Sequence, residues 1–165
     1  DDDEVADAVR RLLARDPRAA LARLDAVLAR RPRGVTLARA LDLRAWSLLA
    51  MGDHAGAVST LDRFPAGIQP SARTQGALAL AEGRRDEGLT LLTYALAHQG
   101  NEVESLLIAQ FLAGTGLAGD VARELLALDG ATGAAAVERL SSQLRRLGAT
   151  EVAASVDALR AAAGR

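Results

Sequence analysis

The chain of 165 residues is long enough for one domain with a substantial core, and 50% of its residues are hydrophobic although only 2% are aromatic. Alanine, leucine and valine therefore supply the apolar surface, which favours closely packed helices over β-sandwiches and barrels, because those folds draw on aromatic and β-branched residues. The formal net charge of −1 argues against a polyanion-binding protein, and the absence of cysteine excludes disulfides, thiol catalysis and cysteine-based metal sites.

Helical periodicity begins near the N-terminus. Apolar residues recur at spacings of three and four through residues 5–13 and again through 21–28, and Asp16 and Pro17 separate the two runs. Asp16 is a good N-cap residue, Pro17 suits the first turn of a helix, and Pro32 then ends the second run. These residues are predicted to form one αα-hairpin.

The rest of the chain predicts four more pairs of helices. They cover residues 36–51 and 54–64, 71–81 and 85–97, 102–112 and 119–128, and 132–147 and 150–162. Glycine marks the turn inside each pair, at Gly52, Gly83, Gly116 and Gly148, and Gly100 is expected to end the third pair. Ten helices leave no room for a sheet, so the predicted fold class is all-α.

One domain is expected over residues 1–165, with hairpins at about 4–33, 35–66, 70–99, 101–129 and 132–163. The chain begins at Asp1 without methionine, so we interpret it as processed or as a piece of a longer protein.

The longest uncharged stretch, residues 105–119, is too short and too rich in glycine to span a bilayer comfortably. Arginine supplies all 20 basic residues, which is consistent with a GC-rich bacterial coding bias, with thermal adaptation or with chance. Both cytoplasm and periplasm stay open as compartments.

The four turn glycines recur every 31 to 33 residues, and a similar pattern surrounds each of them. Seven residues before them stand the small residues Ala45, Gly76, Ala109 and Ser141. Leucine stands nine residues after the first three glycines. A period of this length is typical of a solenoid, in which helical hairpins stack on one another. Small residues allow close helix crossings, glycine adopts the left-handed turn conformation, and leucine fills the core between repeats.

This pattern resembles the tetratricopeptide repeat over nearly the whole chain. The second hairpin matches at Ala45, Gly52, Asp53, Ala57 and Leu61, and the third at Gly76, Gly83, Gly88, Leu92 and Ala95. The first matches at Ala8, Asp16, Ala20, Leu24 and Pro32, with Arg15 in place of the turn glycine. In the fifth hairpin Asp157 replaces the large apolar residue, as expected for a last repeat without a covering neighbour. The resemblance implies a right-handed superhelical solenoid of about five αα-hairpins.

In the tetratricopeptide family the first helix of each hairpin lines a concave groove that binds a partner. The groove residues expected from this phasing are Arg39, Asp42, Trp46, Leu49, Arg73, Ala77, Leu80, Leu106 and Gln110. The same face of the fifth hairpin would carry Glu138, Ser142 and Arg145. Trp46 has two interpretations: exposed in the groove it would anchor a partner, and buried it would belong to the core.

Other motifs have structural explanations. Residues 114–119 spell G-x-G-x-x-G, but a dinucleotide site needs that loop between a strand and a helix, and here it falls in an inter-helix turn. His54 and His98 have no second histidine or cysteine at a metal-binding spacing. The arginines of residues 30–33 are expected to meet a helix dipole rather than a phosphate, and the acidic residues 1–4 a helix N-terminus rather than a metal. No catalytic residue, metal or cofactor is expected.

These observations predict a non-catalytic scaffold that binds another protein or peptide and no nucleic acid. One alternative is an accessory region of a larger bacterial envelope or secretion protein, for example in exopolysaccharide export, which tethers a partner enzyme. Self-association through the terminal repeats into a homo-oligomer is another alternative. An enzyme in its own right is the third, for which the chain shows no recognisable signature.

Overall fold

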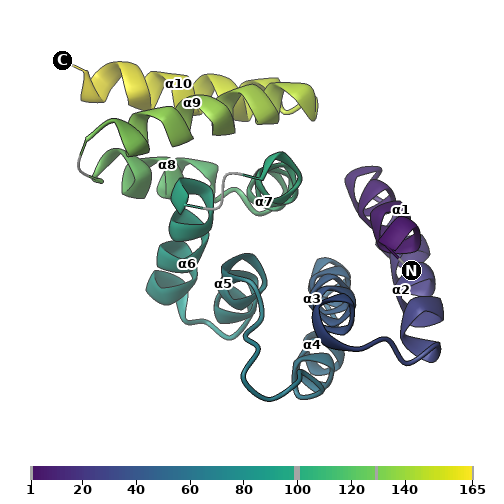
Figure 1. Ribbon diagram of the computed structural model, residues 1–165. Helices are drawn as coiled ribbons and strands as arrows, with labels where there is room; N and C mark the ends of the chain where they lie inside the picture. Colours follow the sequence, from purple (N-terminus) through teal and green to yellow (C-terminus); the bar gives the residue numbers. More distant parts are fainter. Residues whose placement is uncertain (1, 99–100, 129, 165) are drawn as a thin grey trace. The chain divides into compact units, whose positions relative to one another are not determined.

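The computed structural model describes residues 2–98, 101–128 and 130–164, and this part of the chain is helical with no strand (Figure 1). Its helices are α1 (Asp2–Leu13), α2 (Pro17–Ala29), α3 (Gly34–Ala50), α4 (His54–Leu61), α5 (Ala72–Ala81), α6 (Arg85–His98), α7 (Glu102–Thr115), α8 (Ala118–Leu126), α9 (Ala131–Arg146) and α10 (Thr150–Ala163). The predicted all-α class is confirmed. Gly100, predicted to end the third pair of helices, lies outside the described residues.

Short polar side chains cap the N-termini of several of these helices. The carboxylate of Asp16 accepts a hydrogen bond from the backbone N–H of Ala19 at 3.0 Å, and Pro17 occupies the first turn of α2 as predicted. The carboxylate of Asp53 likewise accepts from the N–H of Gly56 at 2.9 Å at the start of α4. These bonds satisfy backbone donors that have no partner inside the first helical turn.

The chain divides into two compact units, unit 1 (Asp1–Arg84) and unit 2 (Arg85–Arg165). The boundary falls between α5 and α6. The hairpin predicted over residues 70–99 is therefore divided, and each of its two helices belongs to a different unit.

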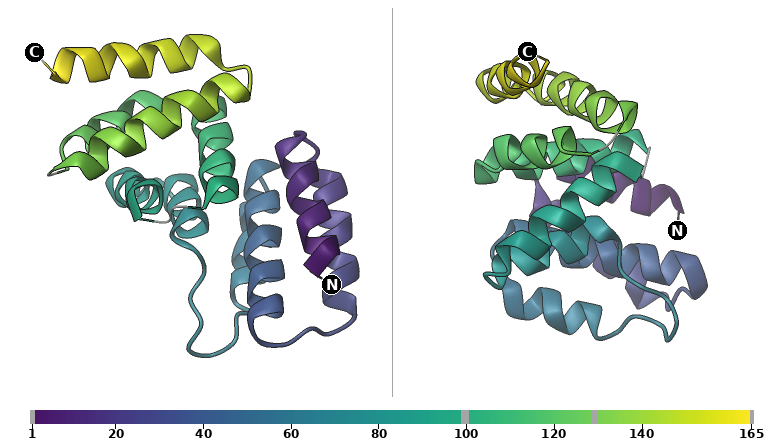
Figure 2. Two further views of the ribbon diagram at one scale, coloured as in Figure 1. Left: turned by 45° about the horizontal axis from the view of Figure 1, so that its top comes forward. Right: turned by 90° about the vertical axis from the view of Figure 1, so that its left-hand side faces the viewer.

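Unit 1 contains the first two predicted hairpins and α5. Helix α1 packs against α2 and α3 against α4, so each pair lies side by side, while α2 and α5 also pack against α3 (Figure 2). The core of this unit includes Leu24 and Leu41, both fully buried. Helix α3 thus contacts every other helix of the unit and positions α5.

Unit 2 contains α6 and the fourth and fifth predicted hairpins. Helix α9 packs along α10 and against α7, and α8 packs against α6 and α10. Buried leucines, among them Leu107, Leu125 and Leu140, fill the space between these helices. Helix α9 therefore packs against both α7 and α10.

The small residues predicted at the helix crossings are buried in both units. They are Ala8, Ala45, Gly76, Ala109 and Ser141, each seven residues before a turn position. In the second hairpin Ala45 and Ala57 form one cluster with Leu48, and Leu61 packs against it. Small side chains at these positions let the paired helices approach each other closely.

Each turn inside a predicted hairpin has the same left-handed backbone. The φ angles are 62° at Arg15, 77° at Gly52, 77° at Gly83, 72° at Gly116 and 80° at Gly148. The residue after each of these positions donates its N–H to the carbonyl five residues before it, as Arg84 does to Ala79 at 2.9 Å. This is the Schellman arrangement of helix C-termini. The turn positions read from the sequence, including Arg15 in place of glycine, are confirmed.

Reciprocal substitutions at two of these turns should change stability in opposite directions. Gly83→Ala should lower the free energy of unfolding by about 1 kcal/mol, because a side chain is disfavoured at positive φ. A Cβ there would meet no atom within 4 Å, so the loss is conformational and not steric. Arg15→Gly should raise it by a similar amount, about 1 kcal/mol, because it relieves that strain. Urea unfolding followed by circular dichroism measures both changes, and shifts of the same sign would contradict this account of the turns.

Candidate functional site

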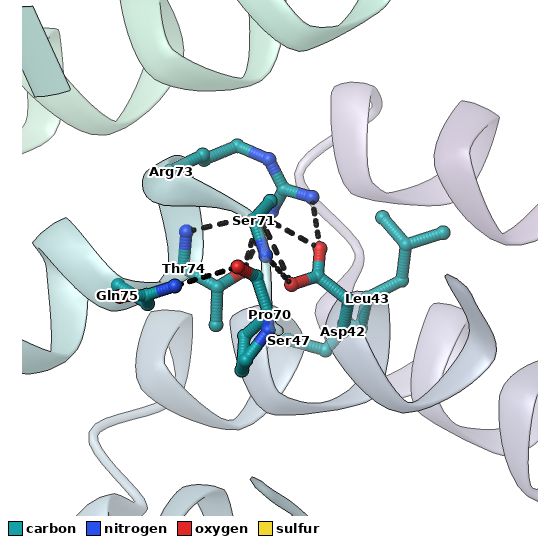
Figure 3. A network of polar contacts seen from close by, with 8 residues as sticks. All are labelled: Asp42, Leu43, Ser47, Pro70, Ser71, Arg73, Thr74 and Gln75. Carbon is teal, nitrogen blue, oxygen red and sulfur yellow. Dashed lines mark hydrogen bonds and ion pairs between the residues drawn. The ribbon is translucent and has the colours of Figure 1, made fainter. Parts of the chain in front are cut away.

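Three predicted groove residues, Asp42 and Trp46 of α3 and Arg73 of α5, meet inside unit 1. Nη2 of Arg73 donates to Oδ2 of Asp42 at 2.6 Å (Figure 3), and the guanidinium carbon lies 4.6 Å from the centroid of the Trp46 ring. The exposed fractions are 7% for Asp42, 4% for Trp46 and 1% for Arg73. A carboxylate and an aromatic face thus compensate a guanidinium that has been removed from water.

Ser71 connects this ion pair to the beginning of α5. Its backbone N–H donates to Oδ1 of Asp42 at 2.9 Å, and its hydroxyl lies 3.0 Å from both carboxylate oxygens (Figure 3). The Ser71 hydroxyl oxygen also accepts from the N–H of Thr74 at 3.2 Å and so caps the helix. We call Asp42, Trp46, Ser71 and Arg73 the Asp42 cluster. Because charge-assisted hydrogen bonds are strong and directional, the cluster fixes the start of α5 on α3.

The structure differs from the sequence prediction in the exposure of these residues. As expected, three of these residues lie together: Asp42, Trp46 and Arg73. They are buried and contact one another within unit 1, so they do not form an open surface. The core interpretation of Trp46 is the one that its burial supports. Among the other expected groove residues, Ala77 and Leu106 are buried, Leu49, Leu80 and Gln110 are half-buried, and Arg39 is exposed. Contact of these residues with a partner stays a prediction.

The glycine-rich segment at residues 114–119 is a turn between two helices. Helix α7 continues through Gly114 to Thr115, Gly116 adopts the left-handed conformation, and α8 begins at Ala118. A helix precedes the glycines where a dinucleotide site needs a strand. The inter-helix interpretation of this motif is confirmed.

The other sequence candidates lie at helix ends. His54 is 3.9 Å from Glu82, and the His98 ring is 4.9 Å from the ring of Tyr94. Arg30 caps α2 and pairs with Glu4, and that bond holds the pKa of the Glu4 carboxyl below its usual range.

Among the described residues no three histidine, aspartate or glutamate side chains form a group that could hold a metal. None of the described helices combines the length and apolarity that crossing a membrane requires.

Two adjoining hollows lie along helix α9 and are lined by polar and charged residues; we call them the α9 surface. The first, of about 310 Å³, lies between α9 and α7 and is lined by Glu102, Ser105, Arg139, Ser142, Gln143 and Arg146. The second, of about 390 Å³, lies between α9 and α10 and is lined by Glu138, Ser141, Ser142, Arg145, Arg146, Asp157 and Arg160. Ser142 and Arg146 belong to both hollows. The three residues predicted for the fifth hairpin's groove face, Glu138, Ser142 and Arg145, share the second one.

Ion pairs cross the α9 surface on both sides. Arg146 pairs with Glu102 of α7, and Arg145 pairs with Asp157 of α10. The hydroxyl of Ser141 donates to Asp157 at 2.6 Å. These bonds, that from Arg145 first, hold the pKa of the Asp157 carboxyl below its usual range. The aspartate that replaces the expected apolar residue of the fifth repeat therefore joins α10 to α9 through polar contacts.

The α9 surface is more basic than the unit around it. Four arginines and three carboxylates line the two hollows. Residues 85–165 as a whole contain seven arginines and ten acidic residues. Arg139 lies at the edge of the first hollow, where its Nη2 donates to the carbonyl oxygen of Leu96 at 3.0 Å near the end of α6. The two hollows therefore have a local excess of one positive charge, whereas the unit as a whole has more acidic residues than arginines.

No family model matches the chain, and no curated protein or solved structure matches it either. The residues and their geometry are therefore the basis on which a function can be assigned.

One residue of the α9 surface has an unusual environment. Gln143 is 6% exposed and lines the first hollow, and its buried Oε1 has no hydrogen-bond partner among the described residues. A buried acceptor without a partner lowers stability. The sequence prediction missed Gln143 together with Arg139 and Arg146. Their spacing of four and three residues, which repeats along one face of a helix, was the available signal.

Proposed function

We propose that the chain is a non-catalytic helical-repeat scaffold, a right-handed solenoid of about five αα-hairpins, that binds a partner protein or peptide. The observation that carries this proposal is the α9 surface, whose adjoining hollows extend from α7 across α9 to α10. Helix α9 is the first helix of the fifth predicted hairpin, and first helices line the binding groove in tetratricopeptide repeats. The five equivalent left-handed turns support the repeat architecture.

The composition of the α9 surface favours a polypeptide as its partner. Arginine is enriched in protein interfaces, and the ion pairs of this surface are partly exposed, so a partner can replace them at little cost in free energy. A local excess of one positive charge is small beside the basic stripe of a nucleic-acid-binding domain. Two hollows that share Ser142 and Arg146 offer neighbouring sites to an extended segment.

A matched pair of tyrosine variants tests the proposal. Ser142 is exposed and belongs to both hollows, so Ser142→Tyr should fill the α9 surface without disturbing the core. Ser155 is exposed on α10 and lines neither hollow, so Ser155→Tyr is the control. Peptides selected against the parent protein from a displayed random library should bind the parent and Ser155→Tyr equally. We expect their affinity for Ser142→Tyr to fall about tenfold or more, which corresponds to losing one well-packed contact.

Two outcomes would contradict the proposal: a selection that enriches no peptide, or peptides that bind all three proteins equally. Fluorescence anisotropy measures the dissociation constants. Light scattering at the assay concentrations should give the monomer mass of 17.2 kDa. A mass that grows with concentration would favour the alternative of self-association through the terminal repeats.

A further inference from the structure

The hollow between α9 and α10 is lined by an arginine, Arg160, that makes only one weak contact within the protein. We propose that this hollow binds the carboxylate of an aspartate or glutamate side chain in a partner peptide. Arg160 is the residue that contacts the carboxylate, and Glu138 competes with it for the same guanidinium. This inference rests on the proposed function and names the class of peptide that the α9 surface selects.

Arg160 has hydrogen-bond donors that the protein itself does not use. Its Nη1 lies 3.9 Å from Oε2 of Glu138, which is longer than a hydrogen bond, and within the described part of the chain its guanidinium forms no hydrogen bond. The side chain is 44% exposed, so a ligand in the hollow reaches it. A guanidinium carries five donors, and its planar fork matches a carboxylate. Arg160 can therefore bind a carboxylate without losing a hydrogen bond of the folded protein.

Arg145 places a second positive charge in the same hollow but is already engaged. Its Nη1 donates to the Ser141 hydroxyl oxygen at 2.7 Å, and its Nη2 pairs with Asp157. The bond from Arg145 is the largest cause of the lowered pKa of the Asp157 carboxyl, and the charge of Arg160 contributes to it as well. Asp157 and Arg160 are three residues apart and so lie on one face of α10. Arg145 and Asp157 compensate each other, which leaves Arg160 as the arginine of this hollow with the weakest partner.

Glu138 is a carboxylate that a ligand can replace. Its side chain is 75% exposed, and an ion pair this exposed contributes little to stability. An incoming carboxylate therefore displaces Glu138 from Arg160 at little cost. While Glu138 is charged, however, it repels a second carboxylate at the same guanidinium. Removing that charge should strengthen binding, which is the opposite of what most substitutions in a binding surface do.

The charge balance of the α9 surface favours a carboxylate over a phosphate group. Four arginines and three carboxylates line its two hollows, so a single carboxylate neutralises the excess of one positive charge. A phosphoryl group with a charge near −2 would leave the surface negative. The volume of about 390 Å³ lies near the lower end of the range for ligand sites and suits one side chain with its adjoining peptide units.

The probes are fluorescein-labelled dodecapeptides with acetylated and amidated termini, selected against the parent protein from a random library. Blocked termini ensure that a response to acidity comes from side chains. We expect aspartate or glutamate to be enriched in the selected peptides. Arg160→Gln should weaken their binding about tenfold, the usual effect of removing one partner of a charge-assisted contact, and should leave the melting temperature unchanged.

A double-mutant cycle identifies the residue that the peptide's carboxylate contacts. Replacing the acidic residue of the peptide by its amide should also weaken binding to the parent about tenfold. The Arg160→Gln protein should then bind both peptides equally, because each change removes the same contact. Arg123→Gln is the matched control, since Arg123 is an exposed arginine of the same unit and lines neither hollow. It should leave the affinity unchanged.

Glu138→Gln tests the competition directly. It should strengthen the binding of acidic peptides about two- to fivefold, as expected when a weak exposed pair is removed. Glu151→Gln changes the net charge by the same amount at an exposed position of α10 outside both hollows, and should have no effect. A peptide with phosphoserine in place of the acidic residue should bind no more tightly than the parent peptide.

The outcomes distinguish this inference from the proposed function beneath it. It would be overturned by selected peptides without acidic enrichment, by equal losses in Arg160→Gln and Arg123→Gln, by weaker binding to Glu138→Gln, or by tighter binding of the phosphoserine peptide. In each of these cases a loss of affinity in Ser142→Tyr would still support a peptide-binding scaffold. A selection that enriches no peptide would overturn both.

Discussion

Asp42→Ala should lower the free energy of unfolding by about 3–5 kcal/mol, because it removes the carboxylate to which the buried Arg73 guanidinium donates at 2.6 Å. Arg73 is 1% exposed, so water cannot replace the carboxylate unless the packing of α5 on α3 opens. The N–H and hydroxyl of Ser71 also lose their acceptor. Urea unfolding measures the loss, and near-ultraviolet circular dichroism of Trp46 reports whether the Asp42 cluster remains ordered.

Asp25→Ala is the matched control for that substitution. Asp25 also pairs with an arginine, Arg44, at 2.8 Å, but its side chain is 51% exposed. Exposed pairs contribute about 0–1 kcal/mol, so this variant should remain close to the parent. A double variant, Asp42→Leu with Arg73→Met, should recover much of the loss, since an apolar pair can replace a buried ion pair. Equal, small losses in the two alanine variants would mean that water reaches Arg73.

Gly133→Ala should lower the free energy of unfolding by about 3 kcal/mol, at the upper end of the range for overpacked sites. A Cβ at this position of α9 would lie 2.0 Å from the carbonyl oxygen of Leu125 in α8. That neighbour is backbone and cannot rotate away, so the two helices must separate. Thermal unfolding measures the loss, together with the helix content of the native state.

Gly114→Ala is the control for the loss of a helical glycine. Gly114 lies in α7 outside the left-handed region, and a Cβ there would meet no atom within 4 Å. The substitution should therefore stabilise the protein by about 0.5–1 kcal/mol, the difference in helix propensity between the two residues. If both alanine variants were more stable than the parent, the close approach of α8 and α9 would be wrong.

Local features of the sequence predicted the helices well, because punctuation by capping and turn residues does not depend on distant neighbours. Asp16 and Asp53 are N-cap residues of α2 and α4, and their carboxylates accept hydrogen bonds from the first turn of each helix. Arg15 adopts the left-handed conformation that its position in the repeat predicts. The differences lie at helix ends. Helix α7 continues three residues past the predicted end at 112, because only the left-handed Gly116 terminates it.

Features that depend on several helices could not be predicted in this way. The phasing placed Asp42 and Arg73 on neighbouring faces, but their burial depends on how α5 lies against α3. The need for glycine at position 133 arises from a carbonyl in another helix. The burial of the Gln143 side chain likewise depends on how other helices pack around α9. A single helix pattern contains none of this information.

The position of the boundary between the two units has a consequence for proteolysis. Arg84 and Arg85 are both exposed and follow the left-handed Gly83, and α6 begins at Arg85. Trypsin cleavage after Arg84 would sever no helix. The N-terminal fragment would keep α1 to α5 whole and the C-terminal fragment α6 to α10, so a nick at this peptide bond separates two intact sets of buried leucines. In the repeat phasing this bond lies inside the third predicted hairpin, whereas the boundary between the two compact units falls at the same bond.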